Sequence, residues 1–276
     1  MKIAIVKLSA LGDIVHAMVV LQFIKKHNPE IIIDWVVDES FIELLELHPD
    51  INKVHSVSLK KEKKKKSLFS LFKELKKVSQ FGPYDVVIDM QGLIKSAVIS
   101  RLIPSTVTLG FDKSSVREGI SSIFYNQTFK YSYDKNVVER NLALIANLLN
   151  FTVTEKSIIN KEFFLHSSNR FKFNAISNSI PNIILIAGAS YNSKIYSYKK
   201  LAEVASTIEA NFIIVWGNKM EKLLAGKIKT LCPKVQVMDK LSIDLLVSLI
   251  SQADLVIGSD TGPTHMAWAL NIPSIA

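Results

Sequence analysis

Apolar and polar positions along the chain alternate between short β-branched runs and longer stretches with helical spacing. The first run, residues 3–6, is long enough for one buried strand. After small and polar residues, apolar side chains recur at three- and four-residue steps from Ile14 to Ile24, which predicts a helix. The N-terminal stretch is therefore expected to form strand, loop and helix, with Ser9, Gly12 and Asp13 at the junction.

The same alternation continues through the rest of the chain. Further buried strands are predicted at residues 31–37, 54–59, 84–90, 107–111, 183–186, 212–216, 235–238 and 255–258. Helices are predicted around residues 41–47, 68–78, 201–208, 243–250 and 265–270, and a helix should open after the polar loop that begins at residue 91. Strands that alternate with helices form βαβ units and parallel sheets.

The pattern loosens near residue 160 and becomes rich in serine and asparagine until Pro181 marks a fresh start. We therefore predict an α/β protein with two domains and a cleft between them. The expected first domain is 1–165, the linker is 166–180 and the second domain is 181–276.

Composition agrees with this division. The 276 residues are 48% hydrophobic and 21% charged, which is enough for two domains with real cores. No apolar run reaches the roughly 18 residues of a membrane-spanning helix, and the chain opens on a core strand without a signal-peptide pattern, so a cytoplasmic location is expected. Cys232 is the one cysteine, which excludes an internal disulfide and a cysteine-based zinc site.

The net charge of +9 has one conspicuous source, the lysine segment 60–66 with six lysines and one glutamate. Such a segment is either a solvated loop or a docking patch for a polyanion, meaning nucleic acid or phosphorylated lipid. Nucleic-acid binding would need interleaved aromatic residues or a known reading module, and the segment offers neither. No nucleic-acid partner is expected.

Asp13 is the first candidate for chemistry, because loops at the carboxyl ends of strands bind ligands in open α/β sheets. Gly12 permits the close approach of a ligand, and His16 follows one turn later. A plain helix N-cap would also explain an aspartate here. The pattern Lys-x-Ser-x-x-Gly-Asp lacks the three glycines of a dinucleotide fingerprint.

The most specific stretch of the second domain is Ser259–His265. Backbone N–H groups of Thr261 and Gly262 at a helix start offer a phosphate site, and Pro263 suits the first helical turn. The side chains of Thr264 and His265 would add bonds to a diphosphate. An N-capped helix alone would account for Asp260 or Thr261, but not for Gly262 and His265.

Two further polar residues follow strands of the second domain. Lys194 would neutralise the same diphosphate, and Glu221 would accept hydrogen bonds from ribose hydroxyls. Taken alone, each is also explained as an ordinary surface residue.

Together these motifs resemble glycosyltransferase family 9, the heptosyltransferases, over the whole chain. The resemblance implies the GT-B fold, in which two Rossmann-like domains with parallel sheets face a central cleft. The matching stretches are 7–16, 34–39, 89–97, 117–118, 123–126, 138–140, 194, 216–221 and 259–265. Two departures stand out: Tyr196-Ser197-Tyr198 replaces the family's Trp-Pro, and the family continues for several elements past Ala276, so the second domain is expected to be C-terminally incomplete.

The resemblance implies inverting, metal-independent transfer of L-glycero-D-manno-heptose from ADP-L-glycero-β-D-manno-heptose to the first Kdo of Kdo–lipid A, in lipopolysaccharide inner-core biosynthesis. No cofactor is expected, since ADP-heptose is the donor substrate. The implied protein is a monomer, cytoplasmic and peripheral to the cytoplasmic face of the inner membrane, where the acceptor lies.

The family's roles carry over onto matching positions. Asp13 would be the general base, and Lys194 would stabilise the departing ADP. Residues implied to bind the donor are Ser9, Gly12, Ser190, Lys194, Glu221, Asp260, Thr261, Gly262 and His265. Residues implied to face the acidic acceptor are Lys60, Lys61, Lys63, Lys64, Lys95, Arg117 and Arg140.

Three alternatives stay open on sequence grounds. A second-heptose transferase of the same family is the nearest, although the Leu-Gly-Asp-x-x-His start and the Gln-Gly-Leu-x-Lys-Ser-Ala loop favour the first-heptose type. The others are a nucleotide-sugar epimerase of the same fold and a nucleotide-binding protein without turnover.

Overall fold

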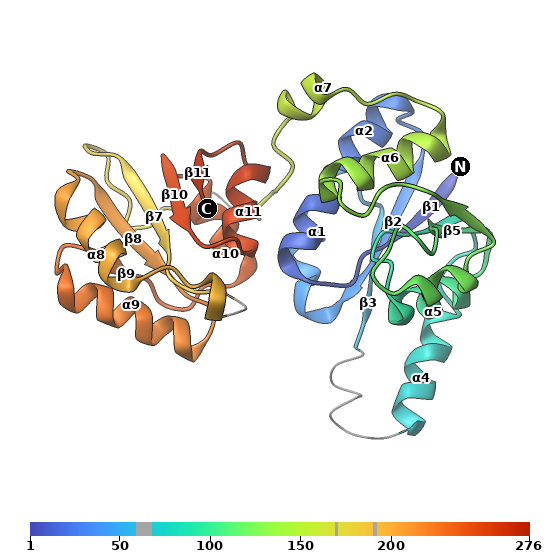
Figure 1. The fold of residues 1–276 in the computed structure, drawn as a ribbon, viewed down its shortest axis with the longest axis horizontal. Coiled ribbons are helices and arrows are strands. Elements are labelled where there is room, and N and C mark those ends of the chain that lie inside the picture. Colours follow the sequence, from blue (N-terminus) through green and yellow to red (C-terminus); the bar gives the residue numbers. More distant parts are fainter. Residues whose placement is uncertain (59–67, 169–170, 190–191) are drawn as a thin grey trace. The chain divides into compact units, whose positions relative to one another are not determined.

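The computed structural model describes residues 1–58, 68–168, 171–189 and 192–276. These residues form two compact units, Met1–Lys161 and Glu162–Ala276 (Figure 1). Each unit is built on one parallel sheet with helices against it, so the α/β prediction is confirmed.

The first unit holds a six-stranded sheet in the order β3-β2-β1-β4-β5-β6. Every neighbouring pair is parallel. The strands are β1 Lys2–Val6, β2 Ile32–Asp38, β3 Lys53–Val57, β4 Tyr84–Asp89, β5 Ser105–Phe111 and β6 Gln127–Phe129. Central strands such as β1 are buried at nearly every position, because helices cover a parallel sheet on both faces.

The helices of the first unit form two groups. The first group comprises α1 Leu11–Met18 and α2 Val20–His27, both of which contact α6 Val137–Leu149 (Figure 1). The second comprises α4 Leu68–Val78, α5 Ile94–Leu102 and the 3-10 helix η2 Gly119–Phe124. The short helices η1 Glu39–Leu44 and α7 Glu155–Ile159 complete the unit.

The second unit repeats the plan with five strands in the order β11-β10-β7-β8-β9. The strands are β7 Asn182–Ile186, β8 Asn211–Val215, β9 Gln236–Val237, β10 Leu255–Gly258 and β11 Ser274–Ile275. The helices are η3 Asn192–Lys194, α8 Tyr198–Thr207, α9 Lys219–Leu231, α10 Ile243–Ile250 and α11 Gly262–Ala269. Helix α8 packs on α9, and α10 packs on α11.

Two local predictions were wrong. The helix expected around residues 41–47 is the 3-10 helix η1, which Asp38 caps by accepting the backbone N–H of Ser40. No helix was predicted between the strands at 212–216 and 235–238, but α9 begins at Lys219 because Asn218 caps it through the N–H of Glu221. The apolar pattern of α9 is weak, because only Ala225 and Ile228 of its thirteen residues are buried.

The stretch predicted as a linker, 166–180, belongs to the second unit, and its described part contacts helix α10. The backbone N–H of Ser168 donates to Asp244 at 2.9 Å, and that of Phe171 donates to Ser248 at 3.1 Å. The Phe173 ring is buried there.

The helices that the structure describes lie within residues 1–58, 68–168, 171–189 and 192–276. None of them is long and apolar enough to span a membrane.

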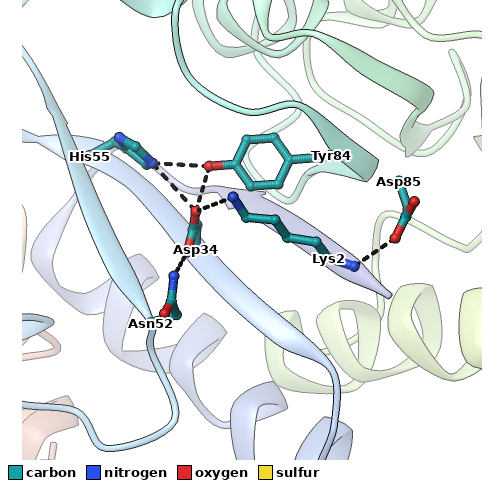
Figure 2. A network of polar contacts seen from close by, with 6 residues as sticks. All are labelled: Lys2, Asp34, Asn52, His55, Tyr84 and Asp85. Carbon is teal, nitrogen blue, oxygen red and sulfur yellow. Dashed lines mark hydrogen bonds and ion pairs between the residues drawn. The ribbon is translucent and has the colours of Figure 1, made fainter.

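A buried polar network centred on Asp34 joins β1 to β4 (Figure 2). Asp34 accepts the Tyr84 hydroxyl at 2.6 Å and the Asn52 side-chain amide at 2.8 Å, with the Lys2 ammonium 3.6 Å away. Burial alone would raise the pKa of Asp34, but hydrogen bonds with His55, Asn52 and Tyr84 outweigh it and hold the pKa below its ordinary value.

Tyr84→Phe should lower the free energy of unfolding by about 1–3 kcal/mol at pH 7, because it removes a donor from a buried carboxylate. A carboxyl whose pKa is depressed by folding stabilises the protein above its unfolded pKa of about 4 and loses that contribution as pH falls through the folded pKa. The deficit of Tyr84→Phe should therefore shrink in acid. Urea denaturation between pH 7 and 3 measures this, with the half-exposed Tyr133→Phe as control. Equal stability of Tyr84→Phe and parent at pH 7 would contradict the account.

Candidate functional site

The first candidate site lies at the carboxyl ends of β1 and β4, where the strand order of the first sheet reverses direction. The loops that follow these strands are tied together by Gln91. Its side-chain oxygen accepts the backbone N–H groups of Leu8 at 3.0 Å and Ser9 at 3.1 Å. The sheet thus brings residues about eighty positions apart to one edge.

Asp13 lies in the first turn of α1, on this edge. The helix N-cap is Ala10, so Asp13 is not itself the cap that the simplest interpretation supposed. One carboxylate oxygen accepts the Ala10 N–H at 3.1 Å, and the side chain is exposed. This contact orients the carboxylate and leaves it accessible to a ligand. Gly12 lies in the same turn and is partly exposed.

A buried lysine beneath this loop was not among the predicted site residues. The Lys7 side chain is 4% exposed, and its ammonium donates to the Met90 carbonyl at 2.9 Å. Burial lowers the pKa of Lys7, while the charges of Asp13 and Asp89 act in the opposite direction. Two features of the sequence could have indicated Lys7: it directly follows a buried strand, and it lies inside the matching stretch 7–16.

Asp89, at the end of β4, is buried and acts on Lys7 through its charge. Burial raises the pKa of Asp89, and hydrogen bonds from the Tyr125 hydroxyl and from the Gly92 and Gln91 N–H groups oppose that shift. The Tyr125 hydroxyl lies 2.8 Å from the carboxylate. The first site therefore combines two buried ionisable residues, Lys7 and Asp89, with the exposed Asp13 at the same strand ends.

The cations predicted to face the acceptor differ in their surroundings. The Lys95 ammonium lies 3.2 Å from the Ser9 hydroxyl, and Arg117 is exposed in the loop after β5. Arg140 is engaged by the protein: it donates to the Ser115 and Tyr133 carbonyls. Its guanidinium also lies over the Phe111 and Tyr133 rings at 4.9 and 4.7 Å.

Five predicted site residues lie outside the described residues. They are Lys60, Lys61, Lys63, Lys64 and Ser190.

The second candidate site lies in the second unit, where the loops after β10, β7 and β8 leave three adjacent strands. Asp260 is its centre. Its carboxylate binds the Lys194 ammonium at 2.5 Å through one oxygen and the His265 imidazole at 3.0 Å through the other. The structure thus brings together three residues that were predicted to bind the donor. Two of them, Lys194 and His265, carry nitrogen donors that can hydrogen-bond to an anion.

The helix start beside Asp260 has the predicted form. Thr261 is the N-cap of α11 without a side-chain cap bond, and Gly262 and Pro263 form the first turn. The Thr264 side chain was predicted to bond to a diphosphate. In the structure the residue is buried, and its hydroxyl donates to the Ser259 carbonyl at 2.7 Å instead. The Ser259 hydroxyl is buried and makes no hydrogen bond within the described residues.

Glu221 fixes the loop after β8 by hydrogen bonds and packs against Gly188 in the loop after β7. Its carboxylate accepts the Gly217 N–H at 2.6 Å and the Asn218 amide at 2.7 Å. The side chain also lies against Gly188, where an added Cβ would be 2.1 Å from its Cγ. A glycine is therefore required at 188 by space, and the predicted ribose contact would use oxygens that already fix the loop.

Gly188→Ala should destabilise the second unit by about 1–3 kcal/mol, because the methyl group must displace Glu221. In a Glu221→Ala background the same change should cost clearly less, since the obstructing side chain is gone. Thermal unfolding of the four proteins of this cycle measures the difference. Equal costs in both backgrounds would refute the contact.

Within the described parts of the chain, no group of three or more His, Cys, Asp and Glu side chains could hold a metal ion.

Comparison with known proteins gives consistent results. Residues 68–276 match the family model of glycosyltransferase family 9 (heptosyltransferase). Lipopolysaccharide heptosyltransferase 1 of Campylobacter coli is 38% identical, with 100% of this chain and 83% of the relative covered. The enzyme of the same name from Pseudomonas aeruginosa is 28% identical, with coverages of 100% and 78%.

Solved structures show the same likeness. The E. coli heptosyltransferase WaaC with ADP-2-deoxy-2-fluoro heptose has a TM-score of 0.82 and 25% identity, covering 99% of this chain and 87% of that one. The E. coli ADP-heptose LPS heptosyltransferase II has a TM-score of 0.72 at 19% identity, with coverages of 99% and 83%, and shares the fold. The chain therefore belongs to glycosyltransferase family 9, the heptosyltransferases, and is a glycosyltransferase with the two-domain GT-B fold.

Proposed function

We propose that this protein transfers the first heptose of the lipopolysaccharide inner core, from ADP-L-glycero-β-D-manno-heptose to the first Kdo of Kdo–lipid A, with inversion. The observation that carries the proposal is the exposed Asp13 carboxylate, fixed by the Ala10 N–H at a sheet edge where ligands bind. The 38% identity to a relative named lipopolysaccharide heptosyltransferase 1 supports the choice of substrate class.

Asp13 would act as the general base. The Kdo hydroxyl oxygen forms a bond to the anomeric carbon of the heptose, and Asp13 takes its proton from within roughly 3 Å, directly or through one water. The bond from that carbon to the diphosphate oxygen breaks, and its electron pair leaves with ADP. Attack opposite the leaving group inverts the anomeric centre.

The second unit would bind the donor and stabilise the leaving group. Charge develops on the diphosphate, so the Lys194 ammonium and the N–H groups at the start of α11 are the expected stabilisers. Asp260 holds Lys194 and His265 together before the diphosphate arrives. Glu221 would accept the ribose hydroxyls. The proposal includes no cofactor and no metal.

The acceptor would meet the cations of the first unit. Kdo carboxylates and lipid A phosphates carry negative charge, which suits the exposed Lys95 and Arg117 and the predicted contribution of the lysine segment. Arg140, whose guanidinium donates to the Ser115 carbonyl, would contribute its positive charge to acceptor binding. Since the acceptor is a membrane lipid, the proposal places a monomeric protein at the cytoplasmic face of the inner membrane.

A choice of two acceptors tests this specificity. The protein and ADP-heptose are incubated with Kdo–lipid A or with Kdo–lipid A that already carries one heptose, and products are identified by mass spectrometry. We expect one heptose to be added to the first acceptor and none to the second. Addition only to the heptosylated acceptor would show a second-heptose transferase instead.

A further inference from the structure

Two isoleucines on η2 project into solvent. Ile120 is 65% exposed and Ile123 is 74% exposed. Residues three apart eclipse one another along a 3-10 helix, so both side chains leave the same side of η2. Ile94, at the start of α5, is 40% exposed, and α5 packs against η2. Single exposed aliphatic residues are common, but three on two contacting elements form an apolar surface, here called the isoleucine surface.

The inward side chains of this region hold η2 in place. Ser121 is buried with its hydroxyl 3.5 Å from the Gly92 carbonyl, and Tyr125 donates to the buried Asp89 at 2.8 Å. Glu118, directly before η2, accepts the Ile94 N–H at 2.7 Å. Turning the isoleucines inward would break these hydrogen bonds, so their exposure is fixed by the fold.

Positive charge borders the isoleucine surface. Lys95 follows Ile94, and Lys113 and Arg117 precede η2, with all three side chains exposed. An aliphatic surface bordered by lysine and arginine is the composition that binds the interface of an anionic bilayer.

Two acidic side chains, Asp112 and Glu118, belong to the same region. Asp112 accepts hydrogen bonds from Ser114 and Ser115, which lower its pKa, and Glu118 binds the Ile94 N–H. Hydrogen bonds from neutral donors leave both carboxylates negatively charged, so the three cations Lys95, Lys113 and Arg117 exceed them by one positive charge.

The isoleucine surface adjoins the first candidate site. The Lys95 ammonium, one residue from Ile94, lies 3.2 Å from the Ser9 hydroxyl in the loop that leads to Asp13. A lipid bilayer against this surface would therefore lie next to the proposed base.

We propose that the isoleucine surface inserts into the headgroup layer of an anionic lipid bilayer. The inference rests on the proposed function, whose acceptor is a membrane lipid, and it identifies the part of the protein that docks. A second copy of this chain fits less well, because a two-fold contact through the isoleucine surface would bring two positively charged borders together. Binding of acyl chains of the acceptor alone is separated from bilayer binding by the test below.

Sedimentation with vesicles of phosphatidylglycerol and phosphatidylcholine, free of acceptor, tests the proposal. The parent should bind, and Ile120→Ser/Ile123→Ser should bind at least about ten-fold more weakly, because two aliphatic side chains are lost from the interface. Ile159→Ser is the matched control, since Ile159 is 72% exposed but lies on α7. Unchanged binding of the double variant, equal loss in the control, or no binding of the parent would overturn the proposal.

A fluorescent label gives a second, independent readout. Cys232 is the one cysteine of the chain and is 3% exposed, so Ile123→Cys can be labelled selectively with an environment-sensitive dye. Anionic vesicles should shift its emission to shorter wavelength, whereas the same dye on Ile159→Cys should not respond. No shift at position 123 would contradict insertion.

Transfer assays keep this inference separate from the proposed function. With a deacylated, water-soluble Kdo acceptor, Ile120→Ser/Ile123→Ser should turn over like the parent, and with acceptor in vesicles it should be slower. If the double variant matched the parent with the acceptor in vesicles as well, the membrane role would be overturned. Failure of the parent to transfer heptose would overturn the proposed function, and the vesicle experiments would still decide the docking surface.

Discussion

Asp13→Asn is expected to lower kcat for heptose transfer by about 10²–10⁴-fold, because loss of a general base typically costs that much. The substitution keeps the shape of the side chain. Its amide oxygen can still accept the Ala10 N–H, so the start of α1 should be preserved. Single-turnover transfer from ADP-heptose to Kdo–lipid A measures the loss.

ADP affinity separates this effect from damage to the fold. The residues proposed to hold the diphosphate belong to the second unit, so calorimetry should show ADP binding by Asp13→Asn within about two-fold of the parent. Retention of more than about a tenth of the parental kcat would remove Asp13 from the role of base. A loss of ADP binding together with turnover would point to a structural role.

Lys194→Ala is expected to have the second largest effect. Charge-assisted bonds to a diphosphate are strong, and removal of a group that stabilises developing charge typically costs about 10²–10³-fold in kcat. The same change removes the ammonium that pairs with Asp260. Part of the weaker donor binding of Lys194→Ala therefore comes from the negative charge of Asp260, which would then repel the diphosphate. We expect both a higher Kd for ADP and a lower kcat.

A neighbouring lysine provides the control. Lys199 on α8 is exposed and has no proposed role, so Lys199→Ala should behave like the parent in both assays. If Lys194→Ala and Lys199→Ala lower kcat equally, the effect is one of general surface charge, and the assignment of Lys194 fails.

The main features of the fold could be predicted from the sequence because its buried strands differ clearly from the segments around them. Buried parallel strands such as residues 3–6 and 183–186 are continuous apolar runs between polar loops. Helix α9 was not predicted because its apolar face is narrow, and η1 was predicted as an ordinary helix although it is a 3-10 turn capped by Asp38. Local spacing alone does not report either feature.

The candidate sites were predictable to a smaller degree. Loops at strand ends pointed to Asp13 and to Ser259–His265, because topology places such loops on one edge of a sheet. The pairing of Lys194 with Asp260 depends on residues 66 positions apart, and no local pattern specifies it. The buried position of Lys7 depends in the same way on its contact with Met90, which only the folded sheet creates.

Release of ADP from ADP-heptose, with and without Kdo–lipid A, tests the central claim most directly. The account predicts release that requires the acceptor and disappears in Asp13→Asn. Release at the same rate without acceptor, or undiminished release by Asp13→Asn, would contradict a transferase in which Asp13 activates the Kdo hydroxyl.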